Sequence, residues 1–320
     1  MQQTRVVQGL PYYNKFVEHF KKIEELAEAD EQEVLRLWQG LGYYSRARNL
    51  HKCAKIVAKN FDGNFPFGYK NLIKLPGIGK YTAAAIASFA FGEKVAAVDG
   101  NVYRVLSRVY GIDADISTGK GQKVFEEWAN DIIPDQQPDT FNQALMEFGA
   151  MQCTPKSPSC GDCVFRVECY ARSNNMQGDL PVKSTRVKVQ NRYFHYLVFK
   201  DGQKLAMKKR SGQDIWKGLY DFHLFESDES QDMDVLIEVD SLLKNVKDFI
   251  SDVEISADYK HILTHRIINA RFFTFFLKPG YDKALDKLMK EYELQFFSEK
   301  DIAELPKPVL VSRYLNGTIF

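Results

Sequence analysis

Four of the five cysteines in the chain lie between Cys153 and Cys169, with the spacing C-x6-C-x2-C-x5-C. Four thiols this close in sequence can surround one metal ion or one cluster. In a long chain without an export signal, such a spacing indicates metal binding rather than disulfides. The spacing alone leaves zinc and an iron–sulfur cluster as alternatives, and the candidate ligands are Cys153, Cys160, Cys163 and Cys169.

Charge and hydropathy exclude few functions. No apolar run approaches the roughly 20 residues needed to cross a bilayer. The N-terminal segment Met1-Gln2-Gln3-Thr4 lacks the pattern of a signal peptide, so we expect a cytoplasmic protein without a membrane partner. The formal net charge is +1, which argues neither for nor against nucleic acid. Any DNA-binding face must therefore be a local basic patch.

The spacing of apolar residues changes along the chain. Helical spacing and intervening turns predict a mainly α-helical domain over residues 1–172. Residues 173–188 are polar and broken by Gly and Pro, which predicts a linker. Strand-like runs mixed with helical stretches predict an α+β domain over residues 189–320. The expected helices include Pro11–Leu26, Val34–Trp38, Leu50–Val57, Thr82–Phe91, Val102–Val109, Phe125–Ile133, Met233–Leu243 and Tyr281–Tyr292, and the expected strands are Arg192–Phe199, Lys204–Lys208, Tyr220–Leu224 and Asn269–Leu277.

The segment Leu75-Pro76-Gly77-Ile78-Gly79-Lys80 predicts a tight turn before a helix that begins near Tyr81. Gly77 and Gly79 allow close backbone approach, and the next helix presents free N–H groups at its N-terminus. This arrangement suits a DNA phosphate. An ordinary helical connection without a ligand is the alternative, and the turn alone does not decide between them.

A second helix start follows at Val98-Asp99-Gly100-Asn101, where Asp99 or Asn101 is the expected N-cap. A role as N-cap alone would explain the aspartate at position 99 without a catalytic function. A carboxylate at a helix start can also face a cleft and stabilise a developing cation. Asp99 is therefore a candidate catalytic residue as well as a candidate cap.

The turn Leu75–Gly79, the segment Val98–Arg104 and the cysteine spacing occur in one order and at characteristic separations. In combination they resemble the helix-hairpin-helix DNA glycosylases that carry a [4Fe–4S] cluster. The resemblance covers residues 1–172. It implies a mainly α glycosylase domain with an iron–sulfur cluster loop, a [4Fe–4S] cluster rather than zinc, and double-stranded DNA as partner, with Gly77, Gly79 and Lys80 at its backbone.

The residue after the hairpin separates two branches of that superfamily. Endonuclease III-like members place a Schiff-base lysine there. Here the position holds Tyr81, and Lys80, one residue earlier, points about 100° away on the helix. Tyr81 therefore indicates a monofunctional glycosylase without a lyase step, and it resembles the adenine glycosylases of the MutY family.

Two more segments resemble the MutY family. Gln2-Gln3-Thr4-Arg5-Val6 is similar to its Leu-Gln-Gln-Thr signature, with Met1 in place of Leu, and Trp38–Arg48 is similar to its second long motif. The resemblance implies that Gln3 and Tyr43 wedge into the duplex around the lesion pair, because a flipped base leaves a space. Without the resemblance, Gln3 would be interpreted as a surface glutamine and Tyr43 as a half-buried tyrosine.

Basic residues near Tyr43 give this segment positive charge. Arg46 and Arg48 are the candidate DNA contacts, although alone they would be an ordinary solvated helix face.

The second domain also carries family features. Lys209–Gly212 and Ile215–Phe222 resemble the Nudix-like domain that adenine glycosylases append to sense 8-oxoguanine. The Glu-rich metal box of Nudix hydrolases is absent, so pyrophosphohydrolase activity is not expected. Leu263-Thr264-His265 lies where the family often has Phe-Ser-His, which implies that His265 contacts the oxidised guanine. The first two residues depart from that pattern, and an ordinary loop histidine is the alternative; Trp216 is expected in the core.

The resemblance implies a reaction: removal of adenine mispaired with 8-oxoguanine, or with guanine, by hydrolysis of the N-glycosidic bond. Its transition state resembles an oxocarbenium ion. Asp99 is the implied stabilising carboxylate, and Tyr81 and Asn101 position the sugar, the carboxylate or water. The family's motif, Glu-x-Met-Leu-Gln-Gln-Thr, also supplies the glutamate that protonates adenine. Aligned through Gln2-Gln3-Thr4, that glutamate would fall three residues before Met1, so we expect a chain truncated before it and impaired in turnover by roughly 10²–10⁴-fold.

Three other functions stay open from the sequence. One is a short form that binds lesions without cutting. Another is an endonuclease III-like bifunctional glycosylase, against which Tyr81 and the C-terminal domain weigh. The third is a zinc-stabilised regulatory protein. We expect a monomer that is nucleoid-associated if the source is bacterial.

Overall fold

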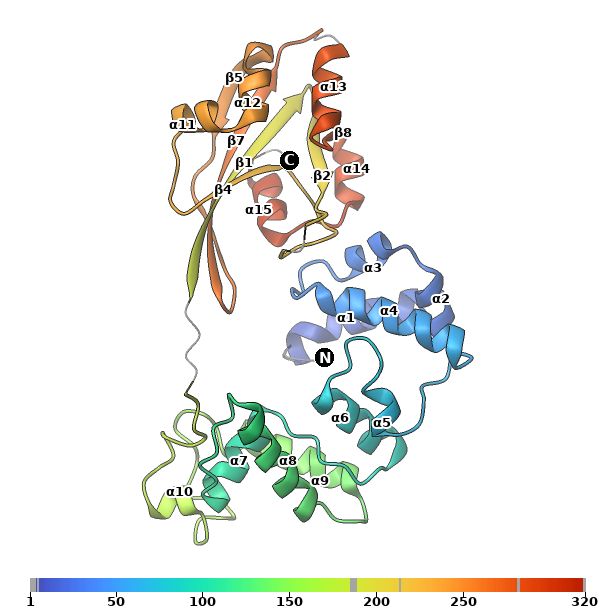
Figure 1. Cartoon of the computed structure of the whole chain (residues 1–320), viewed down its shortest axis with the longest axis vertical. Coiled ribbons are helices and arrows are strands. Elements are labelled where there is room, and N and C mark those ends of the chain that lie inside the picture. Colours follow the sequence, from blue (N-terminus) through green and yellow to red (C-terminus); the bar gives the residue numbers. More distant parts are fainter. Residues whose placement is uncertain (1–3, 5, 185–188, 213, 281–282, 319–320) are drawn as a thin grey trace. The chain divides into compact units, whose positions relative to one another are not determined.

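The computed structural model describes residues 4, 6–184, 189–212, 214–280 and 283–318. Its internal contacts group these described residues into two compact units, one formed by those up to residue 51 with those from residue 189 onward and the other by residues 52–184. Figure 1 colours both along the sequence. The predicted domain boundaries at residues 172 and 189 rest on sequence motifs, whereas these units are defined by packing. The boundaries therefore stay a prediction.

The unit of residues 52–186 is built from helices around one small core. Val102 and Leu106 of one helix pack with Phe125 and Ala129 of the next, at the i, i+4 spacing of one helical face. The helices are the second half of α4 (Ser45–Asn60), α5 (Tyr69–Leu72), α6 (Lys80–Phe91), α7 (Gly100–Tyr110), α8 (Gly119–Ile132), α9 (Pro138–Met151) and α10 (Tyr170–Ser173).

The segment after α10 packs onto this same unit as far as it is described. The Met176 amide donates to the Ala171 carbonyl over 2.8 Å, and the Ile116 amide donates to the Val182 carbonyl over 3.0 Å. The Ser184 hydroxyl donates to the Asp115 carboxylate. Of the predicted linker, residues 174–184 are therefore held by α7 and its neighbours, and residues 185–188 lie outside the described residues.

The first helices of the chain belong to the other unit. They are α1 (Val6–His19), α2 (Ile23–Glu28) and α3 (Glu31–Leu37). The single helix expected over Pro11–Leu26 is wrong, because the Glu25 carboxylate accepts hydrogen bonds from the amides of Lys21 and Lys22 and starts α2 anew. Apolar residues keep a helical period across this break, so their pattern does not reveal it.

A mixed sheet forms the centre of this unit. Its longest strands, β1 (Gln190–Asp201) and β7 (Arg266–Leu277), pair in parallel from Gln190 opposite Arg266 to Lys200 opposite Phe276. The other pairings are antiparallel, and the order is β3-β2-β1-β7-β5, with β4 on β1, β6 on β7 and β8 on β2. The remaining strands are β2 (Lys204–Lys209), β3 (Tyr220–Asp221), β4 (His223–Ser227), β5 (Ile250–Ile255), β6 (Tyr259–Ile262) and β8 (Gln295–Phe297).

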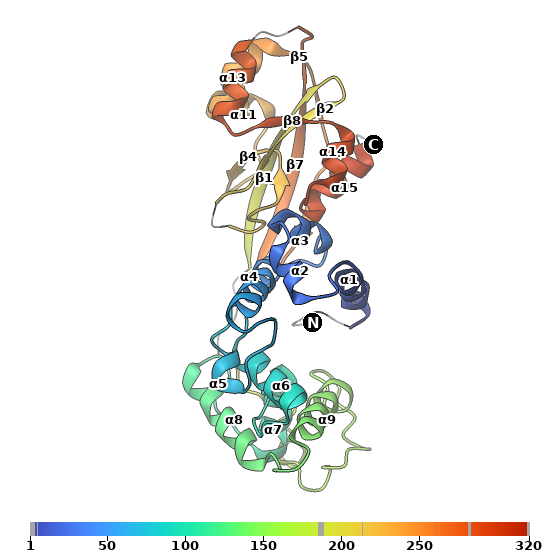
Figure 2. The same cartoon turned by 90° about the vertical axis from the view of Figure 1, so that its right-hand side faces the viewer.

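Apolar side chains cover both faces of the sheet, since successive residues of a strand point to opposite faces. Leu197 and Phe199 pack under α11–α13, whereas Phe194, Tyr196 and Val198 pack against the other face. Figure 2 shows the sheet between these two layers. The covering elements are α11 (Met233–Val239), α12 (Ser241–Val246), the 3-10 helix η1 (Lys247–Phe249) and α13 (Lys283–Glu291) on one side, and α14 (Glu299–Glu304) and α15 (Val309–Thr318) on the other.

The second core includes residues from the start of the chain. Val34 and Leu35 of α3, together with Tyr44 and Ala47, join the cluster that contains Trp216. The expectation that Trp216 lies in the core is confirmed by its 8% exposure. The sheet's second face is thus covered partly by its own helices and partly by the first helices of the chain.

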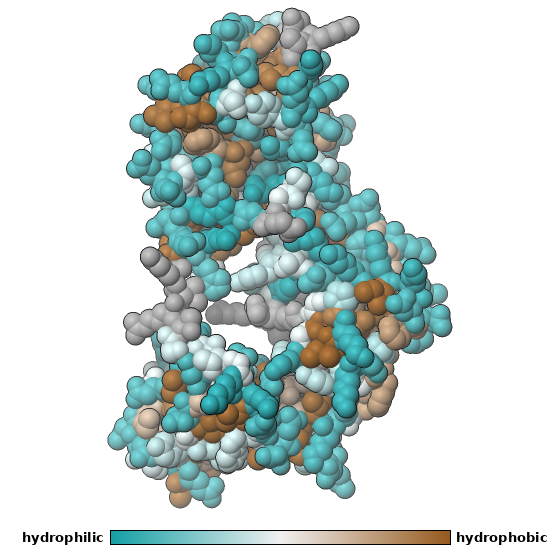
Figure 3. All heavy atoms as spheres, in the orientation of Figure 1, coloured by the Kyte–Doolittle hydropathy of each residue, from teal (hydrophilic) through white to brown (hydrophobic). Residues whose placement is uncertain are grey.

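The surface is mainly hydrophilic on the face drawn in Figure 3, with hydrophobic side chains in separate groups. Within the described residues, no helix is both long and apolar enough to span a membrane.

Candidate active site and cysteine loop

The predicted hairpin joins α5 to α6 and is confirmed. Gly77 has a φ of +76°, in the left-handed region that favours glycine. Gly79 is the N-cap of α6, with extended backbone and no side-chain cap hydrogen bond. Gly77, Gly79 and Lys80 are all exposed. The turn therefore presents the first N–H groups of a 12-residue helix to solvent, where an anion could bind them.

Lys80 has an ionic partner on α8. Its ammonium lies 2.9 Å and 3.0 Å from the two carboxylate oxygens of Glu126. Together with Tyr81 and Asn130, both side chains line a cavity beside α6. The Lys80 side chain is 59% exposed, so this ion pair is weak and a DNA phosphate could compete for the ammonium.

Asp99 is the N-cap of α7, which confirms that part of its predicted role. Its Oδ1 accepts the backbone amides of Asn101 and Val102 over 2.8 Å and 2.9 Å. Its Oδ2 accepts the side-chain amide of Asn101 over 3.0 Å. Three N–H donors thus fix the orientation of a half-buried carboxylate at the start of this helix.

Tyr81 lies in the same region of the unit. Its hydroxyl donates to the sulfur of Met146 on α9 over 3.4 Å. Burial, and next the negative charge of Asp99, raise the pKa of Tyr81 above its ordinary value. The hydroxyl is therefore protonated at neutral pH. Of the three predicted catalytic residues, Asp99 and Asn101 are joined by hydrogen bonds, and Tyr81 lies in the same helical unit.

Arg104 is a residue of this site that sequence reasoning missed. Its side chain donates to the side-chain oxygen of Asn101 over 2.8 Å, to the Gly149 carbonyl over 2.6 Å and to the Cys153 carbonyl over 2.7 Å. It is only 8% exposed. Arg104 thus connects the amide that holds Asp99 to α9 and to the first candidate ligand. In the sequence it is one more cation in a helix, with no signal of burial.

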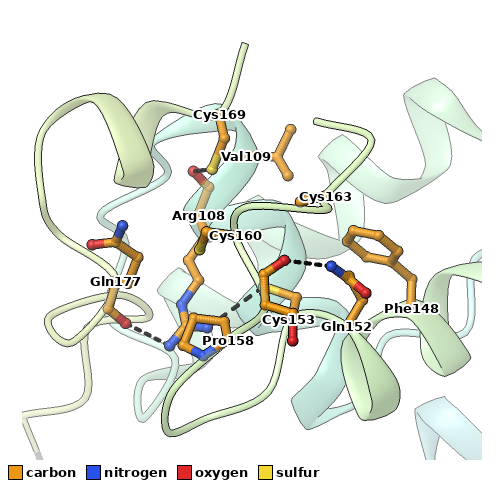
Figure 4. Close-up of a pocket in the computed structure, with 11 residues that line it drawn as sticks. Arg108, Val109, Phe148, Gln152, Cys153, Pro158, Cys160, Cys163, Cys169 and Gln177 are labelled. Atoms are coloured by element: carbon orange, nitrogen blue, oxygen red, sulfur yellow. Dashed lines mark hydrogen bonds between the residues drawn. The ribbon is translucent and has the colours of Figure 1, made fainter. Parts of the chain in front are cut away.

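Arg108, one helical turn further along α7, contacts the cysteine loop (Figure 4). Its guanidinium lies 3.5 Å from the Cys153 sulfur and donates to the Thr154 carbonyl over 2.8 Å. The Cys169 thiol donates to the Arg108 carbonyl over 3.3 Å. The Arg108 guanidinium therefore lies against the first of the four candidate ligands and the backbone that follows it.

All four candidate ligands line one cavity with Arg108: Cys153, Cys160, Cys163 and Cys169. Within the described residues, no three Cys, His, Asp or Glu side chains converge closely enough to hold a single metal ion. A lone zinc ion requires four ligands at about 2.0–2.3 Å from one point. The fifth cysteine, Cys53, is 4% exposed in an apolar face of α4, as expected for a buried hydrophobe.

In the other unit, Tyr43 occupies an unusual backbone conformation. Its φ is +49°, and its side chain is 54% exposed. A non-glycine residue in this region costs about 1–3 kcal/mol and persists only where neighbours enforce it. The Tyr43 hydroxyl shares a short hydrogen bond with the Thr264 hydroxyl. The predicted wedge residue thus points outward and contacts the turn that contains His265, which is exposed.

The predicted DNA contacts Arg46 and Arg48 also have partners within this unit. The Arg46 guanidinium lies 5.3 Å from the Trp38 ring centroid and 5.7 Å from that of Tyr43, and it donates to the Thr4 hydroxyl over 2.9 Å. Arg48 donates to the Lys217 carbonyl over 2.7 Å. Both cations therefore help to hold the segment around Tyr43. Gln3, the other predicted wedge, lies outside the described residues.

A helical hairpin, a helix capped by a fixed carboxylate and a four-cysteine loop, with a mixed α+β domain in the same chain, define a base-excision repair protein. Residues 1–131 match the HhH-GPD superfamily of base excision DNA repair proteins, and residues 195–317 match the NUDIX domain. These matches confirm the predicted fold class of both domains.

Similar proteins specify the family. The adenine DNA glycosylase of Buchnera aphidicola subsp. Acyrthosiphon pisum is 32% identical over 286 residues, which span 88% of this chain and 81% of the relative. That of Homo sapiens is 42% identical over 181 residues, 56% of this chain and 33% of the relative. A solved thermostable thymine-DNA glycosylase is 30% identical with a TM-score of 0.49, covering 54% of this chain and 80% of that one. The chain belongs to the adenine DNA glycosylase family.

Proposed function

We propose that the protein removes adenine mispaired with 8-oxoguanine, or with guanine, from double-stranded DNA by hydrolysis of the N-glycosidic bond. The observation that carries this proposal is Asp99, a half-buried carboxylate at the start of α7 whose two oxygens accept hydrogen bonds from three N–H donors. A carboxylate oriented before the reaction stabilises a developing sugar cation without further reorganisation.

Each part of the site has a role in this reaction. Asp99 faces the cation that forms as the bond breaks, and Asn101 keeps the carboxylate in place. Tyr81 offers a neutral hydroxyl from the same helical unit. The exposed N–H groups of α6 and the Lys80 ammonium bind the DNA backbone. Tyr43 and the turn with His265 contact the lesion pair, as we also propose for Gln3.

We further propose that Cys153, Cys160, Cys163 and Cys169 hold a [4Fe–4S] cluster. Two observations support this proposal: the four cysteines line one cavity, and the chain belongs to a family of glycosylases whose members typically carry such a cluster. Such a cluster cross-links the loop through four thiolate bonds when bound. The chain's own contribution is the guanidinium of Arg108, which lies against Cys153 and the carbonyls of this loop.

The test is single-turnover release of adenine from a duplex with adenine opposite 8-oxoguanine, with residues 1–320 in excess at low salt. We expect Asp99→Asn to lower the rate by about 100-fold or more, because it removes the negative charge. Asp113→Asn, an exposed carboxylate just beyond the other end of α7, is the matched control and should release adenine like the unaltered protein. Equal rates for all three proteins would refute the role of Asp99.

A second function is binding of the lesion pair without excision. It is favoured by the exposed Tyr43 and its hydrogen bond to Thr264 in the turn that contains His265, because these residues would contact the lesion pair without taking part in bond cleavage. Tight, selective binding without adenine release would support this function for these residues. Brisk release would exclude it and would require an acid elsewhere within residues 1–320.

A further inference from the structure

Asp214, in the segment between β2 and β3, accepts hydrogen bonds from three arginines. Arg192 of β1 donates to it over 3.1 Å and 2.7 Å, and Arg210 donates over 3.4 Å. Arg266, the first residue of β7, donates over 3.0 Å. One carboxylate thus joins two strands and the segment of residues 210–219.

Arg266 closes the turn that contains His265. Its carbonyl accepts the Leu263 amide over 2.8 Å, and the His265 carbonyl accepts the Gln190 amide over 3.1 Å. Thr264, at the exposed tip, shares its hydroxyl hydrogen bond with Tyr43. Asp214 is therefore linked to the hydrogen bond between Thr264 and Tyr43 through one side chain, that of Arg266.

The three arginines depend on Asp214 to different degrees. Arg192 also pairs with Glu226 at 2.5 Å, and Arg210 also pairs with Asp221 at 2.7 Å. Among the ion pairs of the described residues, Arg266 has Asp214 as its one carboxylate partner. Loss of the Asp214 charge would leave the first two arginines paired and release Arg266.

The residues next to Asp214 are fixed independently. Trp216 is buried, with a φ of +62°, and its ring contacts those of Phe194 and His261 at centroid distances of 6.1 Å and 5.6 Å. The Lys217 carbonyl is held by Arg48 of α4. The segment of residues 214–217 thus has other anchors, whereas the Leu263–His265 turn has its ionic anchor at Asp214.

We propose that Asp214 is a positioning residue that, through Arg266, sets the Leu263–His265 turn against Tyr43 and thereby determines selectivity for 8-oxoguanine over guanine opposite adenine. This inference rests on the proposed function. The two bases differ at the C8 oxygen and the N7 hydrogen, a difference that a fixed hydroxyl or imidazole can detect by hydrogen bonding. A turn that is free to move detects it less well, because its donors are no longer pre-oriented.

The experiment measures the affinity of residues 1–320 for two duplexes, adenine opposite 8-oxoguanine and adenine opposite guanine, at one salt concentration. We expect Asp214→Asn to lower the ratio of the two affinities by about tenfold, the effect of losing roughly one hydrogen bond. Affinity for the guanine duplex should stay within about twofold of the unaltered protein. Asp258→Asn is the matched control, because it removes the nearer of the two carboxylate partners of another β7 arginine, Arg271, at 2.7 Å and away from the turn.

A second variant keeps the test independent of folding. Arg266→Gln leaves Asp214 paired with Arg192 and should reproduce the loss of selectivity, and the double variant should lose no more than either single one. An unchanged ratio in Arg266→Gln, or an equal loss of affinity for both duplexes, would overturn the proposal. Unaltered protein that binds both duplexes equally would instead overturn the proposed function.

Discussion

Replacing Arg104 with lysine keeps the charge inside α7 and removes the planar fork of donors. Arg104 has four acceptors on the protein: the Asn101 side-chain oxygen and the carbonyls of Gly100, Gly149 and Cys153. A single ammonium cannot reach α9, the cysteine loop and Asn101 at once. At least two acceptors in buried or part-buried hydrogen bonds then lack a donor, at about 1–3 kcal/mol each, so we expect the free energy of unfolding to fall by about 2–6 kcal/mol.

The assay is urea unfolding of residues 1–320, followed by far-UV circular dichroism, together with the iron content of the purified protein. Arg172→Lys is the matched control, since Arg172 is exposed on α10 and donates to one described carbonyl, that of Arg166. It should change the free energy of unfolding by less than about 0.5 kcal/mol. An Arg104→Lys protein as stable as this control, with full iron content, would refute the reasoning that the fork joins α7, α9 and the cysteine loop.

Three further outcomes can be checked with simple variants. A Cβ on Gly149 would lie 2.7 Å from the Asn101 Cβ, so Gly149→Ala should lower the free energy of unfolding by an overpacking cost of about 1–3 kcal/mol, whereas Gly178→Ala, in open space, should not. Burial raises the pKa of Asp214, but the hydrogen bonds from Arg192 outweigh it and lower that pKa from 3.8 to about 2. The folded pKa is below the unfolded one, so the ionised carboxylate stabilises the fold above about pH 4 and this contribution disappears as the pH falls toward 2. Urea midpoints of Asp214→Asn should therefore depend less on pH in this range, and parallel pH profiles would contradict the assignment. Metal analysis of the purified protein should find iron and little zinc, and Cys160→Ser should lose most of the iron; zinc at one equivalent would contradict the proposed cluster.

Local features of the sequence predicted the hairpin and the capped helix of the candidate active site well. The turn Leu75–Gly79 and the cap at Asp99 depend on residues within one or two helical turns, so their structure is encoded where they stand. The predicted helix boundaries were wrong where the helical spacing of apolar residues continues across a break in the helix. Residues 233–243 look like one helix, but Asp240 ends α11 and its side chain caps α12 by accepting the Leu243 amide.

Elements whose pattern is weak or short were missed, among them β5, β6, β8, α9, α14 and α15. Contacts between distant residues were missed for a different reason. The burial of Arg104 requires Gly149 and Cys153 to arrive beside it, and the Tyr43–Thr264 contact joins residues 221 positions apart. No spacing rule connects such pairs, because packing determines them.

The core on the second face of the sheet has a consequence for synthesis. Leu35 and Ala47 emerge from the ribosome early, but their buried partners, from Phe194 to Leu315, are made last. At roughly 5–20 residues per second, the nascent helices keep an uncovered apolar face for roughly ten seconds to a minute. During that interval they are exposed to chaperones and proteases. A premature stop codon in the second half of the gene would therefore also leave the apolar face of the first fifty residues uncovered. These residues are encoded far from the stop codon.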